Sequence, residues 1–459
     1  MQVPEQLIKS LQTVPGFDEA AFRSVHETGR QVTSIRLNPE KISDPGTLIF
    51  NSESGDKPPS VSRVPWCKHG YYLSHRPKFT LDPLLHAGAY YVQEASSMFL
   101  WHVLDSAAAG FTNPKVLDLC AAPGGKSTLL SSFFRKGMVV SNEVIKSRVN
   151  ILQENVTKWG DGNVVITNND SKDFSALKGF FDVIVTDVPC SGSGLFRRDP
   201  EAVQEWSPGN VHLCCQRQQR ILADIIPSLK QGGLLIYSTC SYSVEEDEDI
   251  LDFIIDGFQL SPVDIPVPEE WNIARSRSAK HGATGFRFFP NRVEGEGFFI
   301  AVFRQENMVS QARLPEAAMS FANTKESALV NAFIHLPEGS EIFKHAETLR
   351  LFPAMFVNPL RQLMKQLYIR QAGIALGSPK GDTLIPDHAL AVSAIDGMFP
   401  EQEVSTEQAV AYLRKQDMHF TGPQGWCRIT YRRCGLGWVK NLTNRTNNYY
   451  PSNWRILKT

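Results

Sequence analysis

Short apolar runs alternate with helical patterns through the middle of the chain. The runs are rich in Val, Ile and Leu and lie at residues 115–119, 138–141, 164–167, 182–186 and 233–238. This alternation is typical of a mostly parallel sheet buried between helices. Two aromatic-rich runs, 285–290 and 297–304, flank a glycine-containing turn and predict an antiparallel hairpin at the sheet edge. The sequence therefore predicts an α/β fold.

The segments on either side of this alternation have other patterns. Residues 1–80 begin with a helical pattern and continue with an alternating run at 32–37, which predicts a small α/β module. Residues 306–396 mix helical segments with Pro and Gly, so we expect a connecting α/β region there. We expect the central domain to span residues 81–305. The last region, 397–459, predicts one helix and then short strands that carry Trp426, Tyr431, Trp438, Tyr449, Tyr450 and Trp454.

Composition indicates a multidomain protein without membrane features. Its 459 residues suggest about three domains by the usual domain size. No run of eighteen or more apolar residues is present, and the first residues do not form a secretory signal. The eight cysteines lack the paired short spacings of a zinc site. We therefore expect a cytoplasmic protein with reduced thiols, no metal and no membrane partner.

Charge is unevenly distributed along the chain. The formal net charge of −1 argues weakly against a nucleic-acid partner. Residues 418–459, however, contain no Asp or Glu and seven cations, namely Arg428, Arg432, Arg433, Lys440, Arg445, Arg455 and Lys458. Such a basic, aromatic-rich tail favours RNA, because cations attract phosphates and aromatic faces stack on unpaired bases. We assign most of the aromatic side chains to packing and the charges to RNA.

A candidate ligand-binding turn follows the first apolar run. Residues 116–126 have the sequence Val-Leu-Asp-Leu-Cys-Ala-Ala-Pro-Gly-Gly-Lys, a strand that ends in small residues before a helix at about Lys126. Small residues let the backbone approach a ligand closely at the mouth of a parallel sheet. Glu143 is the next acidic residue after the second run, where Rossmann-like sites place a carboxylate on a ribose hydroxyl.

The same turn contains Gly-Lys-Ser at residues 125–127, which allows a nucleoside triphosphatase interpretation with Asp187 as a magnesium ligand. A phosphate-binding loop needs a glycine five positions before the glycine of Gly-Lys-Ser. Cys120 stands at that position. We therefore consider this alternative weak.

Two cysteines follow neighbouring apolar runs. Residues 187–194 have the sequence Asp-Val-Pro-Cys-Ser-Gly-Ser-Gly, and residues 238–242 have Ser-Thr-Cys-Ser-Tyr. In an open α/β sheet both segments fall at the carboxyl ends of strands, in the ligand crevice. A lone cysteine is more often a small buried apolar residue than a nucleophile. Two at strand exits, one close to Asp187, favour chemistry, whereas Cys214 and Cys215 lie on a predicted helix and look structural.

Methylation of a pyrimidine carbon needs such a set of groups. Carbon-5 of cytosine is a poor nucleophile, so a thiolate must first add to carbon-6 and make an enamine-like ring that attacks a methyl sulfonium. A carboxyl group beside ring nitrogen 3 assists the addition, and Asp187 is placed for this role. Afterwards the proton on carbon-5 leaves and the thiol is expelled, which a second cysteine could assist.

These segments resemble the RNA (cytosine-5)-methyltransferases of the bacterial RsmF type. The resemblance extends in order over residues 90–97, 118–126, 187–192, 238–242 and 295–299, and Val188 stands where the family usually has Ala. It implies a Rossmann-like, S-adenosylmethionine-dependent methyltransferase sheet of seven strands with a small N-terminal module. Residues 437–441 and 448–451 resemble the PUA-like RNA-binding module of the same type.

The resemblance also implies roles for individual residues. Cys240 is the nucleophile, Cys190 assists resolution of the adduct and product release, and Asp187 lies close to both cofactor and cytosine. Glu143 binds the ribose and Asp170 lies near the adenine. The methionine end of S-adenosylmethionine lies against the main chain of Cys120, Ala121, Ala122, Pro123, Gly124, Gly125 and Lys126.

The expected activity is methylation of cytosine carbon-5 in RNA by a monomeric enzyme, with small-subunit ribosomal RNA as the substrate and RNA-binding regions at 1–80 and 397–459. The target base must leave its stack, because the chemistry takes place on its edge. A ribosome-assembly protein without catalysis is one alternative, but the residues for catalysis are present. Methylation of an amino group is another, but those enzymes usually carry Asn-Pro-Pro-Tyr where this chain has Asp-Val-Pro-Cys.

Overall fold

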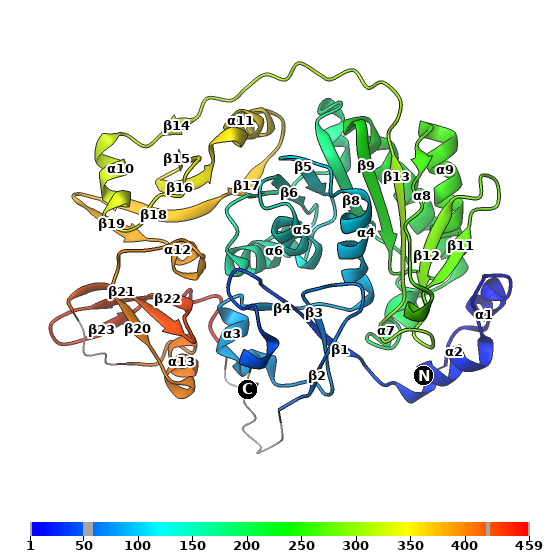
Figure 1. Ribbon diagram of the computed structural model, residues 1–459, viewed down its shortest axis with the longest axis horizontal. Helices are drawn as coiled ribbons and strands as arrows, with labels where there is room; N and C mark the ends of the chain where they lie inside the picture. The colour runs from blue at the N-terminus through cyan, green and yellow to red at the C-terminus, as the bar shows by residue number, and fades with distance from the viewer. Residues whose placement is uncertain (1, 49–57, 419–422, 458–459) are drawn as a thin grey trace.

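The computed structural model describes residues 2–48, 58–418 and 423–457. Within these ranges the strands form four sheets, and Figure 1 shows the largest of them in the middle and right of the molecule. No helix of the described residues is long and apolar enough to span a membrane.

Five parallel strands form the centre of the large sheet, in the spatial order β7-β6-β5-β8-β9. They are the five predicted runs, because their Val, Ile and Leu side chains are buried on both faces. Their bounds are β5 (Lys115–Asp118), β6 (Met138–Asn142), β7 (Val164–Thr167), β8 (Phe181–Asp187) and β9 (Leu229–Thr239).

Helices cover both faces of this sheet. One apolar cluster joins one face to α4 (Leu100–Ala107), α5 (Gly125–Phe133) and α6 (Lys146–Trp159). A second cluster joins the other face to α8 (Pro208–Ile225), α9 (Glu248–Phe258) and α11 (Val357–Gln366). The short helix α7 (Glu201–Glu205) precedes α8. The three-layer arrangement leaves the carboxyl edge of the parallel strands free for a site.

The large sheet contains more strands than the seven that the resemblance implies. The predicted hairpin is present as β12 (Thr284–Phe288) and β13 (Phe298–Arg304), with β13 antiparallel to β9. The hairpin does not end the sheet, because β11 (Ala274–Arg277) pairs with β12. Strand β10 (Ser261–Pro262) pairs with β13, and β17 (Ile369–Ala372) pairs with β7. The sheet therefore has ten strands among the described residues. Strands β11 and β17 pair with edges that would otherwise be open.

The N-terminal region is α/β, and its helices and strands pack on different partners. Helices α1 (Glu5–Leu11) and α2 (Glu19–Thr28) share a core with Phe196, Trp206, Tyr242 and Phe289 of the central domain. Figure 1 shows these helices to the right of the small N-terminal sheet. That sheet has the order β2-β3-β1-β4, and α3 precedes β4. The bounds are β1 (Thr33–Leu37), β2 (Val61–Arg63), β3 (Gly70–Leu73), α3 (Pro83–His86) and β4 (Tyr90–Val92), so the sheet continues past residue 80.

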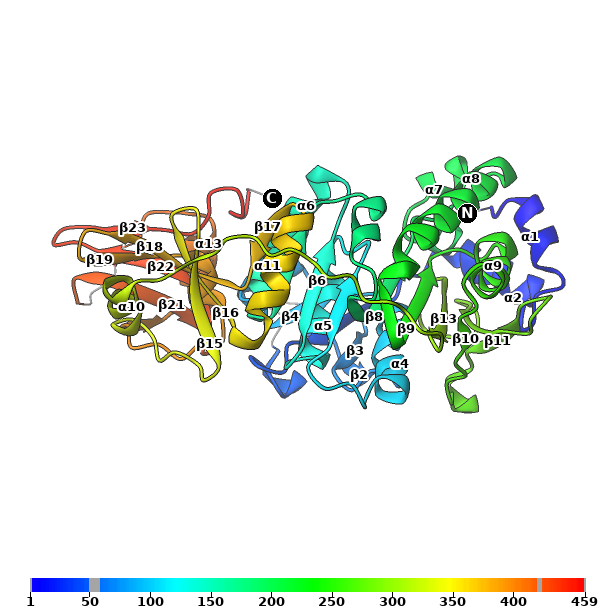
Figure 2. The same cartoon turned by 90° about the horizontal axis from the view of Figure 1, so that it is seen from above.

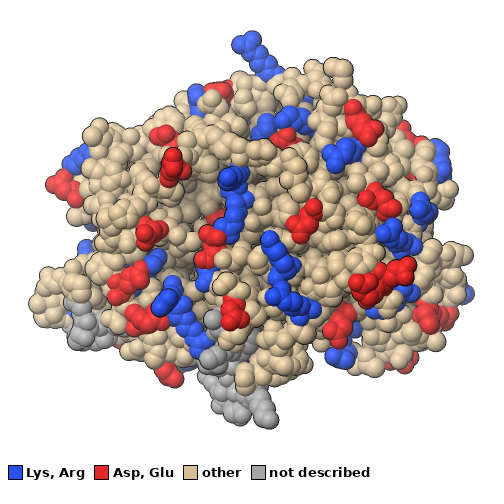
Figure 3. All heavy atoms as spheres, in the orientation of Figure 1, with Lys and Arg blue, Asp and Glu red and all other residues tan. Residues whose placement is uncertain are grey.

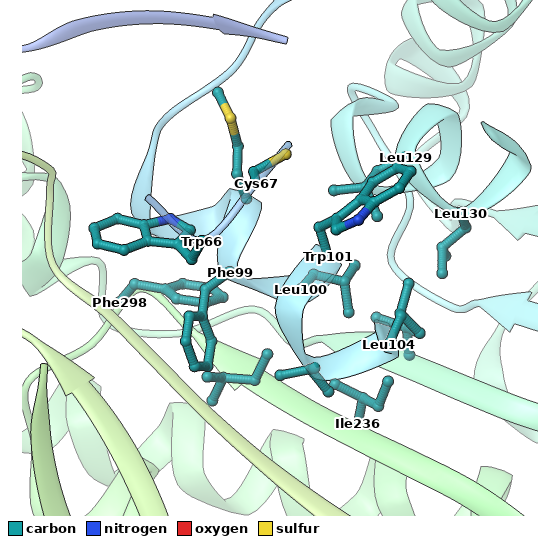
Figure 4. Close-up of a cluster of buried hydrophobic side chains, with 14 of the residues drawn as sticks. Trp66, Cys67, Phe99, Leu100, Trp101, Leu104, Leu129, Leu130, Ile236 and Phe298 are labelled. Carbon is teal, nitrogen blue, oxygen red and sulfur yellow. The ribbon is translucent and has the colours of Figure 1, made fainter. Parts of the chain in front are cut away.

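A buried cluster around α4 joins the small N-terminal sheet to the large one. Figure 4 shows Trp66 beside Phe99 and Phe298, and Leu104 of α4 near Ile236 of β9. The indole Nε1 of Trp66 donates a hydrogen bond to the carbonyl of Ala95 at 2.7 Å, which satisfies its polar atom inside the cluster.

The connecting region forms a sheet of its own beside the large one. An extended segment leads from β13 along one side of the molecule to this sheet, whose order is β14-β15-β16-β18-β19. The bounds are β14 (Ser320–Phe321), α10 (Thr324–Asn331), β15 (Ser340–His345), β16 (Thr348–Pro353), β18 (Ile374–Lys380), β19 (Thr383–Pro386) and α12 (His388–Val392).

The C-terminal region shares its core with the N-terminal sheet. Leu37 and Tyr90 belong to the same apolar cluster as Val439 and Tyr450. Figure 2 shows the C-terminal strands at one end of the molecule and α1 at the other. The elements are β20 (Glu401–Glu403), α13 (Thr406–Leu413), β21 (Gly425–Tyr431), β22 (Cys434–Asn441) and β23 (Thr446–Asn448).

Arg36 on β1 ties the N-terminal sheet to the first turn of α5. The side chain is fully buried, and its guanidinium donates to Gln93 Oε1 at 2.8 Å and to Thr128 Oγ1 at 2.6 Å. It also lies 4.4 Å from the ring centre of Trp159. Burial lowers the pKa of Arg36 to about 10. These contacts hold the segment that follows the candidate ligand-binding turn.

We expect Arg36→Met to lower the free energy of unfolding by about 2–4 kcal/mol, because buried acceptors lose their donor. Lys9→Met removes an exposed cation and should change it by no more than about 0.5 kcal/mol. Urea titrations of both variants measure the difference. Equal stability of the two variants would contradict a structural role for Arg36.

Candidate active site

The parallel strands bring all the predicted site residues to one edge of the large sheet. The turn at 120–126 follows β5, Glu143 follows β6, Asp170 lies three residues after β7, Asp187 ends β8 and Cys240 follows β9. Asp187 is level with Ser238 in the pairing of β8 and β9. The loops that carry the two cysteines therefore leave the sheet side by side.

The sulfur atoms of Cys190 and Cys240 lie 2.8 Å apart. The main chains of the two loops are also in contact, because the amide of Gly194 donates to the carbonyl of Cys240 at 2.8 Å. A Cβ atom on Gly194 would lie 2.7 Å from that carbonyl oxygen, so the approach requires glycine. The contact with Cys240 and burial together raise the pKa of Cys190 well above its ordinary value. Cys190 is thus held as a protonated thiol.

Asp187, which ends β8 three residues before Cys190, has two polar partners. The hydroxyl of Ser238 donates to its Oδ1 at 2.9 Å, and Nζ of Lys126 forms an ion pair with its Oδ2 at 2.8 Å. Burial alone would lower the pKa of Lys126, but the attraction of Asp187 outweighs it and the net shift is upward. The family resemblance implies a role only for the main chain of Lys126, whereas its side chain also reaches Asp187.

The turn after β5 lies next to a buried carboxylate, that of Asp118. Gly124, at φ +113°, caps the start of α5 in a conformation that favours glycine. Asp118 below it accepts a hydrogen bond from Ser127 at 2.7 Å, and its Oδ1 has no hydrogen-bond partner among the described residues. Burial raises the pKa of Asp118 to about 7. An unpaired buried acceptor beside this turn fits a ligand that brings a hydrogen-bond donor.

Glu143 and Asp170 flank the same crevice. Glu143 is almost fully buried and accepts the amide of Ile145 at 2.9 Å through Oε1. Its Oε2 has no hydrogen bond within the described part of the chain, although Arg148 lies 3.3 Å away. Asp170 accepts the amide of Lys172 at 3.2 Å. Both carboxylates retain capacity to accept hydrogen bonds from a ligand.

Two buried charges near the cysteines were missed by the sequence analysis. Glu246 is fully buried beneath both cysteine loops, and Arg287 is buried between Asp247 and Glu248. All three acidic residues lie in the run 245–249, a composition that normally indicates a solvated surface. Only its closeness to the Cys240 motif could have directed attention to this run.

Among the described residues, no three His, Cys, Asp or Glu side chains gather as they would around a metal ion. Positive and negative side chains are interspersed on the face that Figure 3 shows. In the basic tail, Arg433 and Arg445 are exposed, whereas Arg428 pairs with Glu401. The predicted tail cation Lys458 lies outside the described residues.

Three family descriptions match the chain in order. Residues 3–95 match the N-terminal domain of 16S rRNA methyltransferase RsmF, residues 109–304 match 16S rRNA methyltransferase RsmB/F, and residues 399–456 match the methyltransferase RsmF PUA domain. The chain is 30% identical over 438 residues to the Ribosomal RNA small subunit methyltransferase F of Shewanella woodyi, covering 91% of this chain and 89% of that protein. The protein of the same name from Psychromonas ingrahamii is also 30% identical, with 91% and 90% covered.

Solved structures agree with these matches. A methyltransferase homolog protein from Pyrococcus horikoshii has a TM-score of 0.52 and 26% identity, over 66% of this chain and 100% of that one. NSun6 from the same organism, solved with SFG, has a TM-score of 0.54 and 20% identity, over 66% of this chain and 98% of that one. At this identity the likeness supports the fold and nothing further. The predicted S-adenosylmethionine-dependent methyltransferase fold with its two flanking RNA methyltransferase domains is confirmed. The chain therefore belongs to the RsmB/F family of 16S rRNA methyltransferases.

Proposed function

We propose that this chain methylates carbon-5 of a cytosine in small-subunit ribosomal RNA, through a covalent bond between Cys240 and carbon-6 of the base. The observation that supports this most directly is the contact of two cysteine sulfurs, 2.8 Å apart, beside a carboxylate that ends the neighbouring strand. The curated relatives named for the small-subunit RNA support the substrate.

Cys240 starts the reaction by passing its proton to Asp187 while its sulfur attacks carbon-6 of the cytosine. Asp187 and Lys126 form an ion pair beside the sulfurs and can supply a proton to ring nitrogen 3 as the carbon–sulfur bond forms. Electron density from the carbon-5–carbon-6 double bond becomes available for carbon–carbon bond formation at carbon-5. Bound S-adenosylmethionine would supply the methyl group.

Cys190 acts in the second half of the reaction. Its contact with Cys240 is the largest cause of its raised pKa, and this contact changes once the Cys240 sulfur is bonded to carbon. Cys190 then loses its proton to solvent more readily, and the resulting thiolate takes the proton from carbon-5. The double bond re-forms as the carbon–sulfur bond breaks, Cys240 leaves as a thiolate, and the proton on ring nitrogen 3 returns to the Asp187–Lys126 pair.

The site can hold S-adenosylmethionine with residues at the carboxyl ends of four strands, β5, β6, β7 and β8. One buried oxygen each of Asp118 and Glu143 has no hydrogen-bond partner among the described residues, which supports this fit, since each can accept from a donor such as an amine or a ribose hydroxyl. Glu143 would accept the ribose hydroxyls, Asp170 would lie near the adenine and Asp187 near the methyl group. The main chain of Cys120, Ala121, Ala122, Pro123, Gly124, Gly125 and Lys126 would surround the methionine end.

Each region of the chain has its own role in this proposal. Residues 81–305 carry the chemistry, residues 1–80 and 397–459 bind RNA, and residues 306–396 connect them. The exposed cations of the C-terminal region support its role, because they are available to phosphates. The enzyme is proposed to work as a monomer in the cytoplasm.

Substitution of the two cysteines should produce different defects. Cys240→Ala should abolish both methyl transfer and any covalent complex with RNA, because no sulfur is left to attack carbon-6. Cys190→Ala should form the complex, fail to resolve it and remain cross-linked to RNA. Radiolabelled small-subunit RNA on a denaturing gel separates these results, since only a covalent bond survives detergent. Cross-links that accumulate in Cys240→Ala and vanish in Cys190→Ala would reverse the assignment.

Glu143→Ala should raise the dissociation constant of S-adenosylmethionine by about tenfold or more, because hydrogen bonds to a charged acceptor contribute about 1.5–3 kcal/mol. Glu143→Gln keeps an acceptor and should bind with an intermediate constant. Isothermal titration calorimetry measures both. Unchanged affinity in Glu143→Ala would place the ribose contact elsewhere.

Neutralising exposed cations of the C-terminal region should weaken RNA binding in a salt-dependent way. A combined Arg433→Gln, Arg445→Gln and Arg455→Gln variant, which changes three exposed side chains, should flatten the slope of log K against log salt by about two to three, since each lost phosphate contact contributes about 0.7–0.9. Charge changes are preferable to truncation, because this region shares its core with the N-terminal sheet. An unchanged slope, at unchanged cofactor affinity, would show that these charges are merely solvated.

A further inference from the structure

A single carboxylate lies beneath both cysteine loops. Glu246 ends a short helical turn (Val244–Glu246) that follows the Cys240 motif, and its side chain has no exposed surface. Its two oxygens accept hydrogen bonds from residues next to each cysteine, namely Ser191 and Ser241. No step of the proposed chemistry uses this group.

On the Cys190 side, Glu246 contacts the neighbouring residue twice. The amide of Ser191 donates to Oε1 at 2.8 Å, and the hydroxyl of Ser191 donates to Oε2. On the Cys240 side, the hydroxyl of Ser241 donates to the same Oε2 at 2.6 Å. One oxygen atom is therefore shared by the residues that directly follow the two cysteines.

The carboxylate is itself held in place from below. Gln218 on α8 donates to Oε1 of Glu246 at 3.1 Å and lies at the same distance from the carbonyl of Pro189. The hydroxyl of Tyr237 lies 3.0 Å from Gln218 Oε1 and 2.6 Å from the carbonyl oxygen of Glu246. Burial raises the pKa of Glu246, while the hydrogen bonds from the serines and Gln218 oppose that shift. A network satisfied on every side has little freedom to move.

We infer that Glu246 is a positioning residue that sets the distance between the two reactive sulfurs by holding both of their loops through one carboxylate. This inference rests on the proposed function, in which Cys240 attacks and Cys190 releases. Glu246 touches neither sulfur, so it acts only through Ser191 and Ser241. Each serine should consequently affect the step of the cysteine beside it.

The two serines allow the two loops to be loosened separately. Ser241→Ala should slow adduct formation about tenfold and leave no accumulated complex, because it frees the loop of Cys240. Ser191→Ala should form the adduct within about twofold of the wild-type rate but resolve it about tenfold more slowly, because it frees the loop of Cys190. RNA that carries 5-fluorocytosine reports adduct formation alone, since fluorine replaces the proton that must leave. Ordinary RNA reports resolution.

Ser243→Ala is a matched control in the same loop. The Ser243 hydroxyl is buried and has no hydrogen-bond partner among the described residues, so its loss should leave both rates within about twofold. Glu246→Ala should slow both steps, and Glu246→Gln should recover most of the loss, because an amide oxygen still accepts the Ser191 amide while the hydroxyls can rotate.

Three results would overturn the inference. Ser191→Ala and Ser241→Ala could slow the same step equally, or both could behave like Ser243→Ala. Alternatively, both could lose affinity for S-adenosylmethionine by calorimetry, which would show that Glu246 supports the whole domain rather than the sulfur spacing. Failure of the wild-type enzyme to form any adduct on 5-fluorocytosine RNA is a separate result, because it would contradict the proposed function itself.

Discussion

The parallel pairing of β8 with β9 is the constraint on which the site depends. It places Asp187 level with Ser238, so the loops that follow leave the sheet together and their sulfurs come into contact. The approach is close enough that a Cβ on Gly194 would lie 2.7 Å from the carbonyl oxygen of Cys240 and 2.6 Å from that of Gly297. Gly297 directly precedes β13, and the pairing of β13 with β9 places it next to Gly194, about a hundred residues earlier in the sequence. Two cysteines distant in sequence are thus held together by main-chain geometry.

Buried charges surround this pair of loops and limit their movement. Glu246 joins the loops from below, Arg287 is paired with Asp247 and Glu248 beside them, and Lys126 is paired with Asp187 at the mouth. In a low-dielectric interior such contacts are strong only when every polar atom has a well-placed hydrogen-bond partner. Removal of one partner leaves an uncompensated buried charge. This arrangement is suited to preorganisation, because in the proposed reaction the two sulfurs are already in place before the RNA binds.

The sequence was sufficient to predict the strands of the central sheet, because buried parallel strands appear as continuous apolar runs. It was also sufficient to predict the residues at their carboxyl ends, because these directly follow each run along the chain. It was not sufficient for contacts made by distant segments. β17 comes from the connecting region, and α1 packs near Tyr242 rather than on the N-terminal sheet. Arg36 and Glu246 were missed because a charged side chain normally indicates a solvated position, and only tertiary partners explain their burial.

The central claim is that the sulfur of Cys240, and not that of Cys190, bonds to the base. Mass spectrometry of the wild-type enzyme tests it most directly, after trapping on 5-fluorocytosine RNA and digestion with protease and nuclease. We expect a nucleotide mass on the peptide that contains Cys240, with fragmentation that assigns it to that sulfur and leaves the Cys190 peptide unmodified. A nucleotide mass on Cys190, or trapped RNA on neither cysteine, would contradict it.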